Sequence, residues 1–219
     1  MSILFFDIET FIDVSNPRSG LNPLEEESKV ILISFTYFKD ETTISQEIIE
    51  PVILKEWEYK LNGEKRILQT FYSFLKQKVL EDTYINKEGI KRCNLTLSGY
   101  NILGFDIPFL FNRLVKNNID TKNNIYEILI NKPILIDLMQ ISILLSNKSH
   151  KYNKLLPSSQ KTINQKLNIP VKTEEGKKIS EYYINKNFDS IINYVKEEFT
   201  FNLLYLKLKS IIQNLTIKI

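Results

Sequence analysis

The stretch S-I-L-F-F-D-I-E-T at residues 2–10 is short, apolar and β-prone, which predicts a buried strand over residues 2–9. Side chains two positions apart on a strand point to the same face, so Asp7 and Glu9 would share one face. Two buried carboxylates repel each other, and a hard divalent cation that prefers oxygen ligands, such as Mg²⁺ or Mn²⁺, removes the conflict. The alternative is that both carboxylates are solvated at the exit of the strand, and a D-x-E pattern taken alone favours that alternative.

The sequence around this strand alternates between strand and helix patterns. Apolar β-prone runs predict two further strands at 30–38 and 42–50, which with the first strand would form an antiparallel meander. Shorter strands are expected at 95–100 and 134–137. Helical periods or caps predict helices at 64–81, 106–117, 138–146, 158–167 and 188–213. The mixture predicts an α/β layer fold.

Asp106 lies where the strand at 95–100 gives way to a helix, in G-Y-N-I-L-G-F-D-I-P-F-L at residues 99–110. An aspartate at such a junction can simply be an N-cap, and Pro108 suits a first helical turn. The flanking Asn101 and Phe105, in the pattern N-x-x-x-F-D directly after a strand, make a functional role more specific.

Tyr194 and Glu198 are four residues apart on the predicted final helix, so they would lie on one helical face. The helix around them is mostly apolar. Taken alone, the pair is better explained as a partly buried tyrosine beside a surface glutamate.

Together the motifs resemble those of the DEDD-type 3'-5' exonucleases of the tyrosine subtype (DEDDy), and most closely the exonuclease domain of family B DNA polymerases and its stand-alone relatives. F-F-D-I-E-T at 5–10, N-I-L-G-F-D at 101–106 and Y-V-K-E-E at 194–198 are similar to the three exonuclease motifs, in their order. I-L-I-D-L-M at 134–139 resembles the segment that follows the second motif. In the histidine subtype, a histidine lies five residues before the last aspartate of the motif. The single histidine here is His150, and residue 155 is leucine, so the histidine subtype is excluded.

The resemblance implies a ribonuclease-H-like fold, with a mixed five-stranded sheet flanked by helices. It implies a metal-dependent enzyme that hydrolyses the 3' end of single-stranded DNA, or alternatively RNA, and releases nucleoside 5'-monophosphates. It also implies a role for each motif residue. Two ions, Mg²⁺ or Mn²⁺, would be held by Asp7, Glu9, Asp106 and Glu198, Tyr194 would orient the attacking water, and Thr10, Asn101 and Phe105 would lie near the terminal nucleotide.

Glu198 departs from the family, which has aspartate at this position. The charge is kept but the arm is one methylene longer, and metal catalysis depends on geometry. The alternative function is therefore a catalytically weak nucleic-acid-binding or accessory subunit that retains the exonuclease fold. Retention of Asp7, Glu9, Asp106 and Tyr194 favours the active enzyme.

Length and composition agree with one domain over residues 1–219. No apolar run approaches a membrane span and no signal peptide is evident, so we expect a cytoplasmic protein. A single cysteine, Cys93, excludes an intrachain disulfide and a multi-cysteine zinc site.

Residues 148–219 contain 13 Lys and 6 Asp+Glu, which suits a polyanionic partner. Tyr152 and the lysines around it could meet nucleic acid; these are Lys148, Lys151, Lys154 and Lys161. A separate polymerase or another replication or repair protein could also be a partner.

Overall fold

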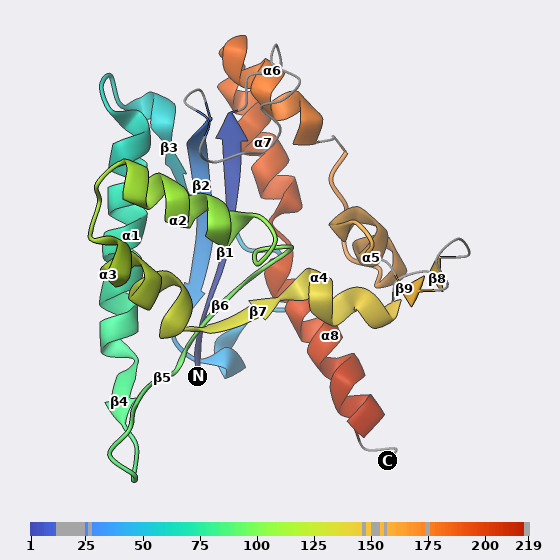
Figure 1. The fold of residues 1–219 in the computed structure, drawn as a ribbon. Helices are drawn as coiled ribbons and strands as arrows, with labels where there is room; N and C mark the ends of the chain where they lie inside the picture. The colour runs from blue at the N-terminus through green and yellow to red at the C-terminus, as the bar shows by residue number, and fades with distance from the viewer. Residues whose placement is uncertain are drawn as a thin grey trace.

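A mixed five-stranded sheet forms the centre of the fold (Figure 1), with strand order β3-β2-β1-β6-β7. The strands are β1 (Ser2–Phe11), β2 (Lys29–Phe38), β3 (Val52–Lys55), β6 (Leu95–Gly99) and β7 (Ile134–Asp137). β1, β2 and β3 pair antiparallel, whereas β6 is parallel to both β1 and β7. The predicted ribonuclease-H-like, five-stranded α/β fold is confirmed, and so is the antiparallel pairing of its first three strands, although the third strand lies at other residues than predicted.

The computed structural model describes residues 1–11, 25, 28–145, 148–149, 154–155, 157–173 and 176–216. Its helices are α1 (Gly63–Glu81), α2 (Asp106–Lys116), α3 (Lys122–Tyr126), α4 (Leu138–Ile141), α5 (Gln160–Lys166), α6 (Ile179–Ile184), α7 (Phe188–Glu198) and α8 (Phe201–Thr216). Two small hairpins pair β4 (Thr83–Ile85) with β5 (Lys91–Cys93) and β8 (Lys148–Ser149) with β9 (Lys154–Leu155). In these ranges no helix combines the length and the hydropathy needed to cross a membrane.

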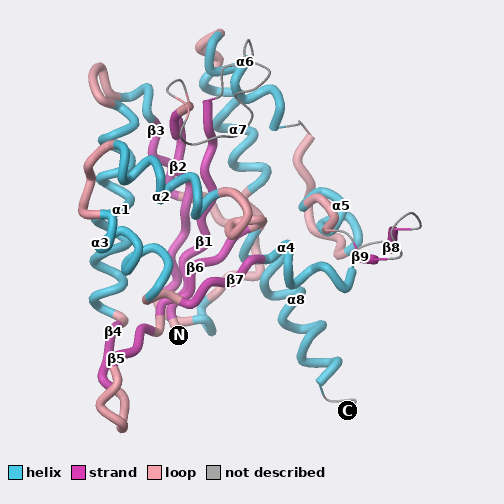
Figure 2. The backbone as a smooth tube through the Cα atoms, in the orientation of Figure 1, coloured by secondary structure: helices cyan, strands magenta, loops and turns pink. Residues whose placement is uncertain are grey.

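Strand β1 is buried on both faces, and its side chains alternate between two hydrophobic clusters. Leu4, Phe6 and Ile8 pack with residues of α1, α2 and α3. Ile3 and Phe5 point to the opposite face, where they pack with residues of α4, α5 and α8. Figures 1 and 2 show these two groups of helices on opposite sides of the sheet. Because Asp7 and Glu9 continue the second series, they face the side of the sheet on which α7 and α8 lie.

The third strand of the meander lies further along the chain than predicted. Residues 42–50 are not a strand; Glu41–Thr43 forms a 3₁₀ turn and β3 begins at Val52. The carbonyls of Ser45 and Glu47 accept hydrogen bonds from the Asn202 side chain at 2.9 and 2.8 Å. A side chain of α8 therefore satisfies backbone groups that a sheet neighbour would otherwise pair.

The single helix predicted over 188–213 is also wrong, since it divides into α7 and α8. The break falls at Phe199 and Thr200, and the rings of Phe199 and Phe201 are buried in the hydrophobic cluster that also contains Ile3 and Phe5. On either side of the break, α7 and α8 bury apolar side chains in different hydrophobic clusters, and the break makes Glu198 the last residue of α7.

Candidate metal centre

The acidic pair lies near the end of β1, next to an irregularity in the sheet. Glu9 pairs with Leu32 but Thr10 pairs with Val30, so β2 has one extra residue, Ile31, at this point. Such bulges twist a strand locally and change the direction of its side chains. Asp7 and Glu9 stay partly exposed, whereas Thr10 is buried. Asp7 and Glu9 are thus on one face of the strand, as predicted.

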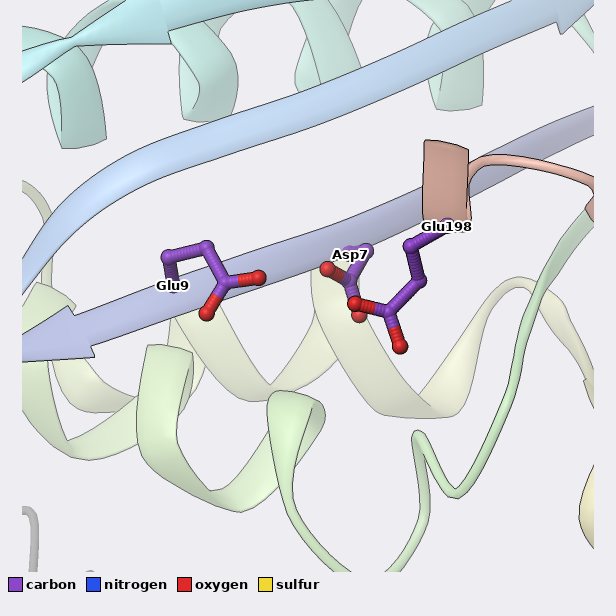
Figure 3. A group of neighbouring side chains, drawn as sticks. All are labelled: Asp7, Glu9 and Glu198. Atoms are coloured by element: carbon purple, nitrogen blue, oxygen red, sulfur yellow. The ribbon is translucent and has the colours of Figure 1, made fainter. Parts of the chain in front are cut away.

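Glu198, at the end of α7, comes to the same place from a distant part of the sequence (Figure 3). One carboxylate oxygen each from Asp7, Glu9 and Glu198 lies within 4.8 Å of the other two. Figure 3 shows the Glu198 carboxylate beside that of Asp7, with Glu9 further along the strand. Within the described residues this is the one group of three or more His, Cys, Asp or Glu side chains placed to hold an ion.

Polar side chains of α5 fix the helix break that carries Glu198. Gln160 Nε2 donates to the Glu198 carbonyl at 2.9 Å and to the Thr200 hydroxyl at 3.3 Å. Asn164 Nδ2 donates to the same hydroxyl at 2.9 Å. All three partners, Gln160, Asn164 and Thr200, are buried. The amide donors of Gln160 and Asn164 make these hydrogen bonds in buried surroundings, so they set the position of the Glu198 backbone.

Asp106 is the most deeply buried of the four predicted carboxylates and opens α2. Its Oδ1 accepts a hydrogen bond from the Ile8 amide, at 3.1 Å, between the two acidic residues of β1. Burial raises the pKa of Asp106 to about 7, although the hydrogen bond from Ile8 acts in the opposite direction. Asp106 is not part of the three-oxygen group, but its charge is close enough to raise the pKa of Asp7.

The cluster is electrostatically strained without a cation. Burial, followed by the charges of Asp106 and Glu198, raises the pKa of Asp7 well above its ordinary value. Burial and the charge of Glu198 do the same to the pKa of Glu9. Like charges at this range favour protonation unless a positive charge intervenes. A set of carboxylate oxygens is also the ligand type that Mg²⁺ and Mn²⁺ prefer, so the residues fit divalent ions.

Tyr194 lies one helical turn before Glu198 and is buried, as the predicted common face requires. Burial, and then the charges of Glu198 and Glu9, raise the pKa of Tyr194 far above its ordinary value. The hydroxyl therefore keeps its proton at neutral pH. It can orient a water molecule by hydrogen bonding, but it is a poor general base.

Lys172, which the motifs did not indicate, completes the cluster. Its ammonium group donates hydrogen bonds to the Tyr194 hydroxyl and to Glu198 Oε1, and it lies 4.3 Å from the centroid of the Tyr194 ring. The sequence around it, N-I-P-V-K-T, contains no motif of the resemblance, and only the tertiary structure brings it to the site.

A cleft of about 370 Å³ opens beside the carboxylates. Its lining includes Asp7, Asn101, Lys172 and Glu198, together with residues 157–161. Of the predicted phosphate-contacting lysines, Lys161 is exposed at this cleft. The Tyr152, Lys148, Lys151 and Lys154 side chains lie outside the described residues, as does His150.

Asn101 and Phe105 belong to the turn that leads from β6 to Asp106. Asn101 has a left-handed backbone, with φ of 63°, and its side chain packs over Gly104, where a Cβ would lie 2.4 Å from Asn101 Oδ1. Phe105 precedes α2 and its ring packs against Phe109, with centroids 5.4 Å apart. Asn101 lines the cleft, while Phe105 anchors the turn in the core.

Asp137 fixes the shape of this turn. Its buried carboxylate accepts hydrogen bonds from the amides of Asn101 at 2.9 Å, Leu103 at 3.1 Å and Met139 at 2.9 Å. Charge-assisted hydrogen bonds of this kind are among the stronger ones. Asp137 thus positions Asn101 and, through the turn, Asp106.

We expect Asp137→Asn to weaken both the fold and the activity. The amide that replaces one oxygen would face a backbone donor, so the melting temperature should fall by roughly 5–10 °C. Displacement of the turn should also lower the activity expected from the sequence motifs by about ten-fold or more. Thermal melts and initial rates measure the two effects. Asp189→Asn, at an exposed aspartate, is the control, and equal behaviour of the two variants would contradict the role of Asp137.

Comparison with known proteins supports the fold. No protein-family model matches the sequence, and no curated protein sequence matches it. Among solved structures, a family B DNA polymerase from the hyperthermophilic archaeon Pyrobaculum calidifontis is similar over 95% of this chain, with a TM-score of 0.60 and 16% identity. At this identity the similarity shows the fold alone. The chain spans 24% of that polymerase chain.

Two exonuclease I structures are more distant. In an exonuclease I/SSB-Ct complex, the match covers 97% of this chain and 43% of the matched chain, with 13% identity and a TM-score of 0.48. In Escherichia coli exonuclease I in complex with a 5cy-dA13 oligonucleotide, the match covers 77% of this chain and 36% of the matched chain, with 16% identity and a TM-score of 0.43.

Proposed function

We propose that this protein is a metal-dependent 3'-5' exonuclease of the tyrosine-type DEDD group, acting on single-stranded DNA. The observation that supports the proposal best is the convergence of Asp7, Glu9 and Glu198, whose ligand oxygens come within 4.8 Å from two separate elements. Three carboxylates held this close together repel one another, so we expect them to bind a cation. Asp106 and Tyr194 stand beside them at the motif positions.

The carboxylates Asp7, Glu9 and Glu198 would hold one divalent ion, and Asp106 would contribute to the second. Bound ions of this kind lower the pKa of a coordinated water and stabilise charge on a phosphoryl group and its leaving oxygen. The protein's own contribution is to fix the ligands. Ile8 donates to Asp106, and the amide side chains of α5 hold the end of α7.

Tyr194 would orient the attacking water. Its high pKa keeps the hydroxyl proton in place, so the hydroxyl can donate to a water oxygen while the carboxylates take part in removing the proton. The cleft beside the carboxylates would receive the terminal nucleotide, with Asn101 on its wall. Thr10, which the motifs placed near the nucleotide, is buried and is not among the residues that line this cleft.

Glu198→Gln is expected to lower exonuclease activity by about 100-fold or more, because the charge is lost from a ligand whose shape is retained. The neighbouring Glu197→Gln is the matched control. Glu197 is exposed and accepts hydrogen bonds from the Thr173 amide at 2.9 Å and hydroxyl at 3.0 Å, outside the three-oxygen group. Initial rates on labelled oligonucleotides measure the effect. An equal loss of activity in both variants would show that Glu198 has no special role as a metal ligand.

The same assay, run with single-stranded DNA and with RNA, identifies the preferred substrate. The alternative role, a nucleic-acid-binding or accessory subunit with weak catalysis, is favoured by one observation, namely that an ammonium group occupies the cluster. Binding of oligonucleotides by the wild type, with no cleavage in Mg²⁺ or in Mn²⁺, would support that alternative and reject the enzyme.

A further inference from the structure

Lys172 is held inside the carboxylate cluster rather than at its edge. Its side chain is 17% exposed, and its ammonium group bonds to Glu198 Oε1 and to the Tyr194 hydroxyl. The ammonium group also lies over the Tyr194 ring, where a cation is attracted to the aromatic face. Three separate contacts therefore fix one positive charge next to Glu198.

The charge of Lys172 acts on the other carboxylates as well. It lowers the pKa of Asp7 and of Glu9, although burial and the neighbouring carboxylates have the larger, opposite effect. Asp7, Glu9, Asp106 and Glu198 carry four negative charges when ionised, and Lys172 balances one of them. The metal-free site is thus only partly neutralised, and its compensation comes from the protein itself.

A divalent ion would compete with this ammonium group. The ion needs oxygen lone pairs of Glu198, one of which accepts the hydrogen bond from Lys172. An ammonium group that remained bound to the same carboxylate would also repel the ion at short range, in surroundings of low dielectric constant. Both cations cannot be held equally well in this geometry.

We propose that Lys172 is an internal counter-cation, which occupies the carboxylate cluster in the absence of metal and must move away from Glu198 when a divalent ion binds. This inference rests on the proposed metal-dependent function. Lys172 also lines the 370 Å³ cleft, so the displaced side chain has space to turn into it. There its charge would meet the phosphodiester of a bound strand, and one residue would stabilise the empty site and then the substrate.

The substitution Lys172→Met tests the competition, because it keeps most of the aliphatic length and removes the charge. We expect Mn²⁺ to bind this variant about ten-fold more tightly than the wild type, while the melting temperature in EDTA falls. Lys172→Arg should retain wild-type affinity. Lys161→Met, at the exposed lysine of the same cleft, controls for the general effect of removing a positive charge.

Titration with Mn²⁺, followed by electron paramagnetic resonance of the free ion, gives the affinities. Weaker or unchanged binding by Lys172→Met, or an equal gain in Lys161→Met, would overturn the inference. Mn²⁺ binding by neither the wild type nor Lys172→Met would reject the proposed metal function itself, and the inference with it. The two failures are therefore distinct.

A second measurement uses only the wild type, in case Lys172→Met does not fold. Lysine acylation, mapped by mass spectrometry, should modify Lys172 slowly in EDTA and several-fold faster with Mn²⁺, since the ion releases the ammonium group from its partners. Modification of Lys161 should not change. Equal or slower modification of Lys172 with Mn²⁺ would show that the ion does not displace it.

Discussion

Asp7→Asn should abolish exonuclease activity and at the same time raise the stability of the metal-free protein. Asp7 would be a ligand whose charge the bound ions need, and its loss should lower the rate by about 10³-fold or more. In the absence of metal the same charge is unfavourable, because burial and the charges of Asp106 and Glu198 raise the pKa of Asp7. Removal of the charge relieves that repulsion without creating a cavity.

The stability gain should be visible as a melting temperature a few degrees above that of the wild type in EDTA, since about 1 kcal/mol shifts a chain of this size by about 2–4 °C. With Mn²⁺ the order should reverse, because the wild type binds the ion more tightly. Asp189→Asn, which removes an exposed carboxylate on α7, serves as the control. An active Asp7→Asn variant, or one destabilised in EDTA, would contradict this assignment.

The metal-free protein should lose stability as the pH rises from about 5 to about 8, and divalent metal should remove the loss. The folded-state pKa values of Asp7, Glu9 and Asp106 are raised, the last to about 7. A carboxyl group with a raised folded-state pKa binds protons more strongly in the folded state. Its contribution is therefore fully present below the ordinary value near 4 and is lost as the pH passes through the folded-state value.

Binding of an ion reverses this trend at high pH, because the ion takes the place of the protons. At about one hundred times its dissociation constant, Mn²⁺ would stabilise the fold by about 2.7 kcal/mol, or about 5–10 °C, at pH 8. At pH 5 protons compete and the gain should be much smaller. Melting curves at both pH values, with EDTA and with Mn²⁺, measure the effect. The pH dependence should be weaker in Asp7→Asn, and a stability in EDTA that rises from pH 5 to pH 8 would contradict the account.

The parts of the site that follow a local rule were predictable from the sequence. Strand alternation placed Asp7 and Glu9 on one face, and the four-residue spacing placed Tyr194 beside Glu198, as the structure has them. The position of Asp106 at the start of the helix that follows this strand was predictable from the change in residue pattern after Gly99. In each of these cases the side-chain direction depends on the backbone within a few residues.

The parts that were not predicted depend on contacts between distant segments. The apolar period of residues 188–213 continues through Thr200, and only the hydrogen bonds from Gln160 and Asn164 show why the helix breaks there. Similarly, Asn202 of α8 takes the place of a strand neighbour at residues 45–47. Propensity describes the local preference of a segment, and tertiary hydrogen bonds overrode it at both places.

Lys172 illustrates the same limit for function. Lysines are numerous in this chain, and neither spacing nor neighbouring residues distinguish Lys172 from the others. Its role is visible only once Glu198 and Tyr194 lie against it. Asp137 is an intermediate case. It is the last residue of the strand at 134–137 and precedes the predicted helix at 138–146, a position that suits its role as a helix cap. Its hydrogen bonds to the turn at 101–103 could not be read from that position.

The most direct test of the central claim is the pattern of products released from single-stranded DNA labelled at either the 5' or the 3' end, in Mn²⁺ and in EDTA. We predict that the 3'-labelled strand releases labelled mononucleotide from the first time point, that the 5'-labelled strand shortens as a ladder, and that EDTA stops both. Internal fragments, mononucleotide from the 5' label at the first time point, or cleavage that continues in EDTA would contradict a metal-dependent 3'-5' exonuclease.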